Sequence, residues 1–110
     1  MQTYKVAFLQ EALDDLEEIV LFIAQDNRNA AIRMHDEIME KVNKLKTFPK
    51  IGRSVPDLKM QNFGFRMLII KPYIAFYGIL EDSVYIYRVI HGATNYPMLY
   101  EKMSTETHEK

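Results

Sequence analysis

The chain has 110 residues, of which 48% are hydrophobic and 12% aromatic, and its formal net charge is −1. This length suits one domain with a single core, and the apolar content is well above that of a disordered chain. There is no cysteine and the three histidines are widely spaced, so we expect neither a disulfide scaffold, a metal nor another cofactor. No apolar run approaches the roughly 20 residues of a membrane span, so we expect a soluble cytoplasmic protein without a membrane partner.

The charge is unevenly distributed along the chain. Residues 1–46 carry −3 and residues 47–100 carry +3, while the sequence pI is about 6.3. The second half could therefore present a mildly positive face. A difference of this size is also ordinary scatter, so the charge alone decides nothing about a partner.

The N-terminal part of the sequence predicts a strand followed by a helix. Residues 3–8 alternate loosely and contain β-forming residues, as in a short strand. From Leu9 to Ile23 the apolar residues recur at helical spacing, with acidic residues on the opposite side. This pattern predicts an amphipathic helix, and its acids are concentrated near the N-terminal end, where the helix dipole favours them.

A second helix is expected after a short break. Residues 25–29 are polar, and Asn27 or Asn29 is the expected N-cap. Residues 30–46 are again amphipathic and have lysines in the last turn. Because the break is short, the two helices should form an antiparallel hairpin. The apolar residues expected in the core are Leu13, Leu16, Ile19, Ile23, Ile38, Val42 and Leu45.

The rest of the chain predicts a β-meander. Residues 53–61 are expected to form a loop. Strands are expected over residues 63–70, 73–80 and 84–90, separated by turns. The fold class is therefore α+β in the order β-α-α-β-β-β, with a helix hairpin packed on a small, mostly antiparallel sheet. Residues 1–103 should form the single domain and residues 104–110 a polar tail.

Alternation in the last strand indicates which side chains face the helices. Val84, Ile86, Arg88 and Ile90 point one way, and Tyr85, Tyr87, Val89 and His91 point the other. We expect the aliphatic set beneath the helices and the tyrosine-rich set on the exposed face, as a binding surface. Arg88 would then have to reach solvent or pair with an acid from the helices. The strand before is apolar on both faces, so either Met67 and Ile69 or the alternate residues face the helices.

The residues that could carry chemistry lie in the β half, because no phosphate-binding loop, Ser-His-Asp order or metal motif occurs. They are Lys59, Arg66, Lys71, Tyr73, Tyr77, Arg88, His91, Tyr96 and Tyr100. Tyr73 and Tyr77 share one strand face and are more simply explained as packing residues. Arg66 suits a surface charge or a phosphate contact equally well. His91 precedes a glycine and suits a turn, although an imidazole could also transfer protons.

Short segments spread over about residues 3–100 occur in a characteristic order. They are Tyr4-Lys5-Val6, the run from Ala12 to Ile19, Phe48-Pro49 with Gly52 and Val55-Pro56, Arg66, Pro72-Tyr73 with Tyr77, and the run from Arg88 to Gly92. In this order and spacing the sequence resembles the RelE/ParE superfamily of bacterial toxins, whose known fold agrees with the pattern above. The resemblance implies a small cytoplasmic toxin that a cognate antitoxin, encoded beside it, holds inactive.

Two activities are known in that superfamily. RelE-like members cut mRNA in the ribosomal A site, and ParE-like members poison DNA gyrase without catalysis. RelE-like nucleases carry an arginine after the tyrosine that matches Tyr73, where this sequence has Ile74, and a further basic residue where it has Ala93-Thr94-Asn95. A pI of about 6.3 also fits poorly with work inside the ribosome. The resemblance therefore favours the ParE-like branch, and an inactive relative that only binds antitoxin is a third reading.

Each reading assigns its own site residues. For a target or antitoxin surface they are Arg66, Tyr85, Tyr87, Arg88, His91 and Tyr96. For a metal-independent nuclease the candidates are Arg66, Arg88, His91 and Tyr100, because RNA cleavage needs a base, an acid and cations for the phosphate. On a regular strand Arg88 and His91 would lie on opposite faces, which counts against a shared catalytic role.

Overall fold

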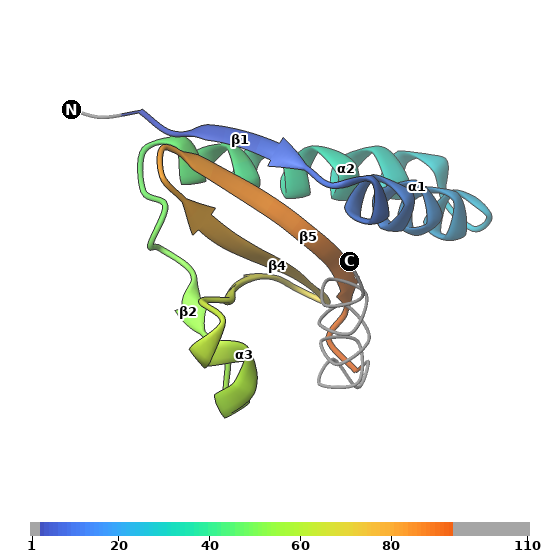
Figure 1. Cartoon of the computed structure of the whole chain (residues 1–110). Helices are drawn as coiled ribbons and strands as arrows, with labels where there is room; N and C mark the ends of the chain where they lie inside the picture. The colour runs from blue at the N-terminus through green and yellow to red at the C-terminus, as the bar shows by residue number, and fades with distance from the viewer. Residues whose placement is uncertain (1–2, 94–110) are drawn as a thin grey trace.

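The structure, a computed structural model, describes residues 3–93. Its elements are β1 (Lys5–Phe8), α1 (Gln10–Ala24), α2 (Arg28–Asn43), the 3-10 turn η1 (Lys44–Lys46), β2 (Arg53–Ser54), α3 (Leu58–Asn62), β3 (Arg66–Ile70), β4 (Tyr73–Leu80) and β5 (Ser83–His91). The α+β class and the helix-hairpin-on-sheet arrangement are as predicted (Figure 1). The predicted loop over residues 53–61 is wrong in detail, since it contains β2 and most of α3. Both are too short to produce a hydrophobic period.

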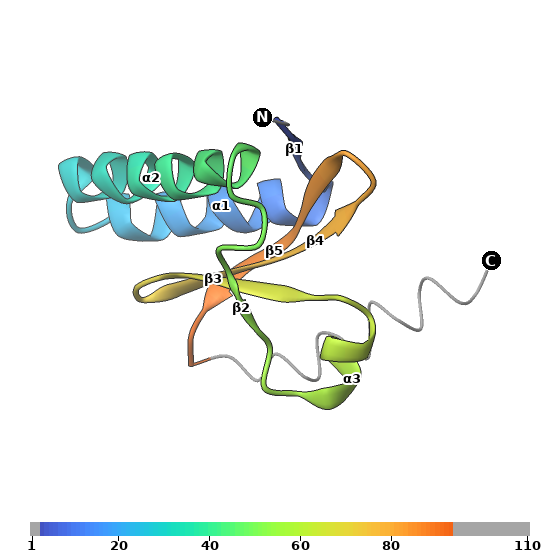
Figure 2. The ribbon, with the colours of Figure 1, turned by 90° about the vertical axis from the view of Figure 1, so that its left-hand side faces the viewer.

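The sheet has five strands in the order β1-β5-β4-β3-β2. β1 pairs with β5 in parallel, and the other pairs are antiparallel. Figure 2 shows α1 and α2 side by side over one face of the sheet and α3 on the other side. The first strand of the chain thus lies beside the last strand described, and α1 follows directly along that edge.

The helix hairpin begins and ends close to where the sequence predicts. The side chain of Asn27, one of the two expected caps, accepts a hydrogen bond from the main-chain N–H of Ala30 at 3.0 Å, which satisfies a free donor of the first turn. Leu16 and Ile19 are buried as predicted, but Leu13 is 45% exposed. Leu13 lies on the margin of the apolar stripe, so its predicted burial is wrong.

The sheet separates two apolar clusters. Toward α1 and α2, the cluster contains Tyr73, Ala75 and Tyr77 of β4 and Ile70 of β3, with Leu68 packed against it. The opposite face holds Val55, Met60, Met67, Ile74, Phe76 and Ile90. On β3 the alternate residues, rather than Met67 and Ile69, therefore face the helices. The packing role predicted for Tyr73 and Tyr77 is confirmed.

A β-bulge in β5 changes the predicted alternation. Tyr77 pairs with Ile86 while Phe76 pairs with Arg88, so Tyr87 is the extra residue. Beyond it the faces are exchanged. Val89, expected on the exposed face, is buried in the helix-side cluster, and Ile90 lies in the opposite one.

Two strand residues, Tyr77 of β4 and Arg66 of β3, hold the connection between η1 and β2 by hydrogen bonds. The Tyr77 hydroxyl donates to the carbonyl of Pro49 at 2.7 Å and accepts from the N–H of Gly52 at 2.9 Å. The Arg66 guanidinium donates to the carbonyls of Lys50 and Gly52 at 3.1 and 3.2 Å. A Cβ at position 52 would lie 2.5 Å from the Tyr77 hydroxyl, so only glycine fits there.

Candidate functional site

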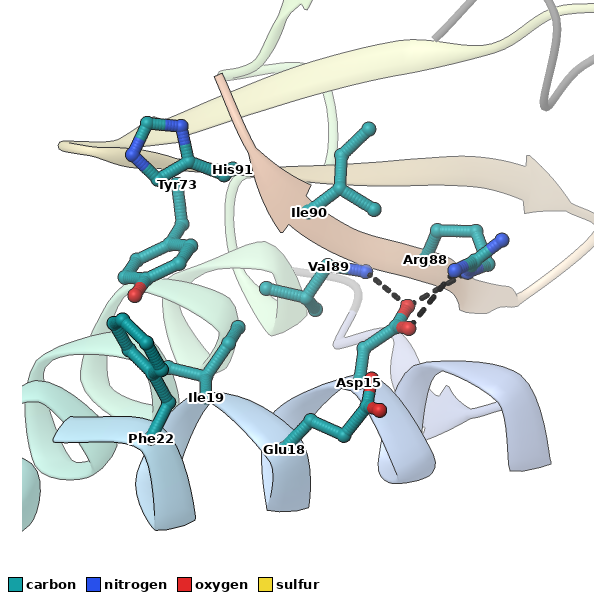
Figure 3. A pocket seen from close by; sticks show the side chains of 9 residues that line it. All are labelled: Asp15, Glu18, Ile19, Phe22, Tyr73, Arg88, Val89, Ile90 and His91. Carbon is teal, nitrogen blue, oxygen red and sulfur yellow. Dashed lines mark hydrogen bonds and ion pairs between the residues drawn. The ribbon is translucent and has the colours of Figure 1, made fainter. Parts of the chain in front are cut away.

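A groove of about 390 Å³ lies between α1 and the C-terminal half of β5 (Figure 3). It is lined by Asp15, Glu18, Ile19, Phe22, Tyr73, Arg88, Val89, Ile90 and His91. The groove exists because β1 ends at Phe8, opposite Ile86, where the chain turns into α1. Within residues 3–93 no strand pairs with this side of β5 beyond Ile86, so α1 forms the opposite wall.

The free edge of β5 is held by one carboxylate. Asp15 accepts the main-chain N–H of Val89 at 2.9 Å, and its two oxygens accept Nε and Nη2 of Arg88 at 2.7 and 2.9 Å. Asp15 is buried, and the Arg88 side chain is only 23% exposed. Of the two alternatives expected for Arg88, the pairing with a helix acid is the one that the structure shows, and it ties α1 to the sheet through a bidentate ion pair.

The electrostatics of the groove keep Arg88 charged. The hydrogen bonds that Arg88 donates to Asp15 raise the pKa of Arg88 above its ordinary value, and the charges of Glu11 and Glu18 act in the same direction against the effect of burial. With Nε and Nη2 engaged by the carboxylate, the planar fork of the guanidinium already has its matching partner. Arg88 therefore works first as a structural cation.

The other end of the groove is aromatic. Tyr73 is buried, and its ring meets the exposed His91 ring edge-on, with centroids 5.6 Å apart. Figure 3 shows Tyr73 pointing toward Phe22 and Ile19 of α1, with His91 beside it at the rim. Phe22 is 70% exposed. The Nδ1 atom of His91 accepts a hydrogen bond from the N–H of Ala93 at 3.0 Å. This contact corresponds to the turn role, one of the two roles expected for His91.

The structure brings Arg88 and His91 to one groove, which the sequence alone did not predict. His91 lies with Tyr73 on the helix side, whereas Arg88 pairs with Phe76, which lies in the opposite cluster. The two side chains line the same groove because Arg88 extends past the free edge of β5 to Asp15.

Arg66 lies apart from this groove. It pairs with Tyr77 in the sheet, while His91 pairs with Tyr73. Tyr73 and Tyr77 are four positions apart on β4, which is about 13 Å along a strand. The Arg66 guanidinium donates to the carbonyls of Lys50 and Gly52. Arg66 and Arg88 therefore lie at two separate sites.

The two candidate tyrosines of β5 lie on the face opposite the helices. Tyr85 pairs with Gly78, and the ring of Tyr87 meets Phe65 edge-on at 5.0 Å. A Cβ on Gly78 would come within 2.9 Å of the Tyr87 ring, so this glycine makes room for it. Burial raises the pKa of Tyr87. The remaining candidates, Tyr96 and Tyr100, lie outside the described residues.

Sequence reasoning missed the importance of Asp15, Glu18 and Phe22 as groove residues. Asp15 carried a usable signal, because it directly precedes Leu16 on the apolar side of α1 while Arg88 breaks an apolar pattern in β5. An acid and a base that each interrupt a buried face are the expected members of an ion pair. Phe22 carried no such signal, since an exposed aromatic on a helix looks like a core residue in sequence.

The groove is better suited to binding than to proton transfer. Its cation is paired and its histidine Nδ1 is occupied. Apolar and aromatic walls with a few polar groups are typical of binding sites.

No helix within residues 3–93 is long and apolar enough to cross a membrane.

Comparisons with known proteins agree with this fold. The chain covers 96% of a structure from the "Chromosomal ParDE TA system from P. aeruginosa" over 81% of its own length, with 20% identity and a TM-score of 0.67. It covers 98% of a structure from the toxin-antitoxin complex RelBE2 of Mycobacterium tuberculosis, again over 81% of its length, with 22% identity and a TM-score of 0.61. Among curated proteins none matches the sequence significantly.

The fold is therefore that of the RelE/ParE superfamily of toxins. The model of the family described as "ParE toxin of type II toxin-antitoxin system, parDE" matches residues 6–96. The chain belongs to this ParE toxin family. The matched range contains β5 and all the groove residues.

Proposed function

We propose that this chain is a ParE-like toxin that acts in the cytoplasm, inhibits growth by binding DNA gyrase without catalysis of its own, and is neutralised by a cognate antitoxin. Membership of the ParE toxin family supports this branch of the superfamily. The observation that carries the proposal is the state of the two candidate arginines, both of which are bound by groups of the chain itself.

Metal-independent RNA cleavage requires cations that can meet the phosphate in the transition state. Arg88 is paired with Asp15 through two hydrogen bonds, and Arg66 is held by two main-chain carbonyls. Ile74, at the place where RelE-like nucleases carry an arginine, is buried among apolar residues. Releasing either arginine would leave a partly buried acceptor without its partner, which typically costs 1–3 kcal/mol or more.

A RelE-like nuclease is the second candidate. One observation favours it, namely that Arg88 and His91 line the same groove although they lie on opposite faces of β5. In that reading His91 is the proton-transfer group and Arg88 leaves Asp15 to meet a phosphate. We rank it second because this exchange opens the ion pair that holds the β5 edge.

Two assays on the same purified protein separate the two candidates. As a gyrase poison it blocks DNA supercoiling by gyrase and stabilises cleaved DNA, and a reporter mRNA translated in its presence remains uncut in primer extension. Codon-phased cuts that require ribosomes and disappear in His91→Ala or Arg66→Ala would make it a nuclease. Expression without growth arrest would instead leave only antitoxin binding.

The antitoxin is proposed to cover the face of Tyr85 and Tyr87 and the region beside Arg66. These tyrosines are only half-buried, and a face this aromatic on a small protein typically serves as an interface. The two similar structures come from toxin–antitoxin systems, which supports a partner of this kind. Co-expression with the adjacent gene product should give one co-eluting peak in size-exclusion chromatography, whereas two separate peaks at micromolar concentration contradict the proposal.

A further inference from the structure

A second cavity, of about 600 Å³, lies in the connection between α2 and β2, away from the groove beside α1. It is lined by Tyr4, Thr47, Phe48, Pro49, Lys50 and Ile51. Figure 1 shows this connection as the green segment that runs from the end of α2 to β2. The main-chain N–H of Tyr4 donates to the carbonyl of Lys46 at 2.8 Å, so the cavity forms where the chain entering β1 meets the end of η1.

The apolar residues of this cavity are exposed although the main chain beneath them is fixed. Phe48 and Ile51 are 58% and 56% exposed. Tyr77 and Arg66 hold the main chain of residues 49–52 by the four hydrogen bonds described above. Because the loop is already ordered, a partner that covers these side chains pays little conformational entropy for ordering it.

The chain segment that forms most of the cavity is basic, and Lys50 itself lines the cavity. From position 41 to position 56 the sequence contains Lys41, Lys44, Lys46, Lys50 and Arg53 and no acid. Lys41 pairs with Glu37 at 3.8 Å, whereas the other four are exposed and form no ion pair within residues 3–93. Unpaired like charges around an apolar cavity favour an acidic ligand, which gains both attraction and burial.

We infer that this cavity binds an acidic segment of the antitoxin, with one large apolar side chain seated between Phe48 and Ile51 and with carboxylates beside Lys46 and Lys50. The inference rests on the proposed function and specifies a second contact for the same partner. The cavity adjoins the Arg66 region assigned to the antitoxin above, because Arg66 holds the carbonyl of Lys50. One extended segment can therefore reach both places.

The test is the affinity of the full-length toxin for the immobilised product of the adjacent gene, measured by biolayer interferometry at low and high salt. We expect Phe48→Ser and Ile51→Ser to weaken binding tenfold or more at both salt concentrations. The double variant Lys46→Glu with Lys50→Glu should weaken it by a similar factor at low salt and by less at high salt, because salt screens exposed charges.

The matched controls are Ile32→Ser, which removes an apolar side chain of similar exposure (52%) from α2, and the double variant Arg28→Glu with Arg33→Glu, which makes the same change in charge on exposed residues of α2. Both should bind within twofold of the unaltered protein. Thermal melting of every variant shows whether the fold is kept.

Three outcomes would overturn the inference. If the unaltered toxin binds the antitoxin but the cavity variants bind within twofold of it, only this inference fails. If the unaltered toxin does not bind at all, the antitoxin proposal fails with it. If the toxin alone self-associates and Ile51→Ser abolishes this, the occupant is a second copy, whose α1 carries five acids and no cation, and not the antitoxin.

Discussion

Asp15 and Arg88 lie 73 positions apart in the sequence and form the bidentate ion pair that joins α1 to β5. The same carboxylate accepts the N–H of Val89, which would otherwise face the open edge of the sheet. Asp15 thus accepts a main-chain hydrogen bond from the C-terminal half of β5, whereas β1 provides such partners for its N-terminal half. This single side chain both protects a strand edge and shapes the floor of the groove.

Removing the carboxylate should destabilise the fold strongly. In Asp15→Ala, Arg88 remains partly buried without its partner and Val89 loses its acceptor, so we expect the free energy of unfolding to fall by about 2–4 kcal/mol. Asp14→Ala is the matched control, because Asp14 is exposed and its neighbour on the same helix; it should change stability by less than about 0.5 kcal/mol. Urea denaturation measures both, and equal losses would contradict the role given to Asp15.

The hydroxyl of Tyr77 is expected to stabilise the connection before β2. Tyr77→Phe leaves the N–H of Gly52 and the carbonyl of Pro49 without their partner, which should cost about 1–3 kcal/mol. Tyr73→Phe removes a hydroxyl for which residues 3–93 provide no hydrogen bond, so it should cost less than about 0.5 kcal/mol. A similar loss for both variants in urea denaturation would show that the hydrogen bonds of Tyr77 contribute little.

Alkaline pH should weaken the fold through the same residue. Burial raises the pKa of Tyr77 above 10.0 in the folded state, so the unfolded chain loses this proton at lower pH than the folded one. Stability from this group is complete below pH 10 and declines as the pH rises through the folded pKa. As the pH rises above 10, chemical denaturation should show a steeper loss of stability for the unaltered protein than for Tyr77→Phe. Parallel curves would contradict the assignment.

Leu16 and Leu13 should differ sharply despite equal chemistry and the same helix. Leu16 is 8% exposed in the helix-side cluster and Leu13 is 45% exposed. Leu16→Ala should therefore cost about 2–5 kcal/mol, and Leu13→Ala less than about 1 kcal/mol. Calorimetric melting of the two variants provides the comparison, and the prediction fails if Leu13→Ala is the more damaging.

One turn residue can be improved. Glu81, in the turn between β4 and β5, has a φ of 57°, a left-handed conformation that costs a non-glycine residue roughly 1 kcal/mol. Glu81→Gly should raise the free energy of unfolding by about 0.5–1 kcal/mol. The neighbouring Asp82→Gly, where φ is not positive, should lower it. Guanidinium denaturation curves displaced in the opposite order would reject this reading of the turn.

The sequence predicted the elements whose signals are local. The helical period, one of the two expected N-caps and the turn-bounded strands depend on neighbouring residues. They appear close to the predicted positions, except that β3 begins at Arg66, whereas its start was predicted at residue 63. The faces of β5 were predicted correctly only up to Tyr87, because a bulge depends on how β4 and β5 fit each other and adds no pattern to either strand. From Arg88 on, each side chain lies on the face opposite to the predicted one.

The groove was predictable only in part. An acid partner for Arg88 was expected, but four acids on α1 besides Asp15 could have served. Which of these acids pairs with Arg88 depends on where α1 crosses the edge of β5, and this is set by tertiary structure. Arg66 shows the same limit: its carbonyl partners at Lys50 and Gly52 belong to a loop whose path is fixed by Tyr77, far along the chain. Because every residue has a main-chain carbonyl, the sequence does not indicate which carbonyls accept a side-chain hydrogen bond.

The pairing of β1 with β5 has a consequence for the order in which the protein is made. Residues 5–8 pair with residues 83–86, and Asp15 pairs with Arg88. Both contacts therefore require β5. A chain still growing on the ribosome therefore has its helix hairpin early, but neither this edge of the sheet nor the groove beside α1. The groove should therefore form only once β5 has been synthesised, because β5 supplies one of its two walls.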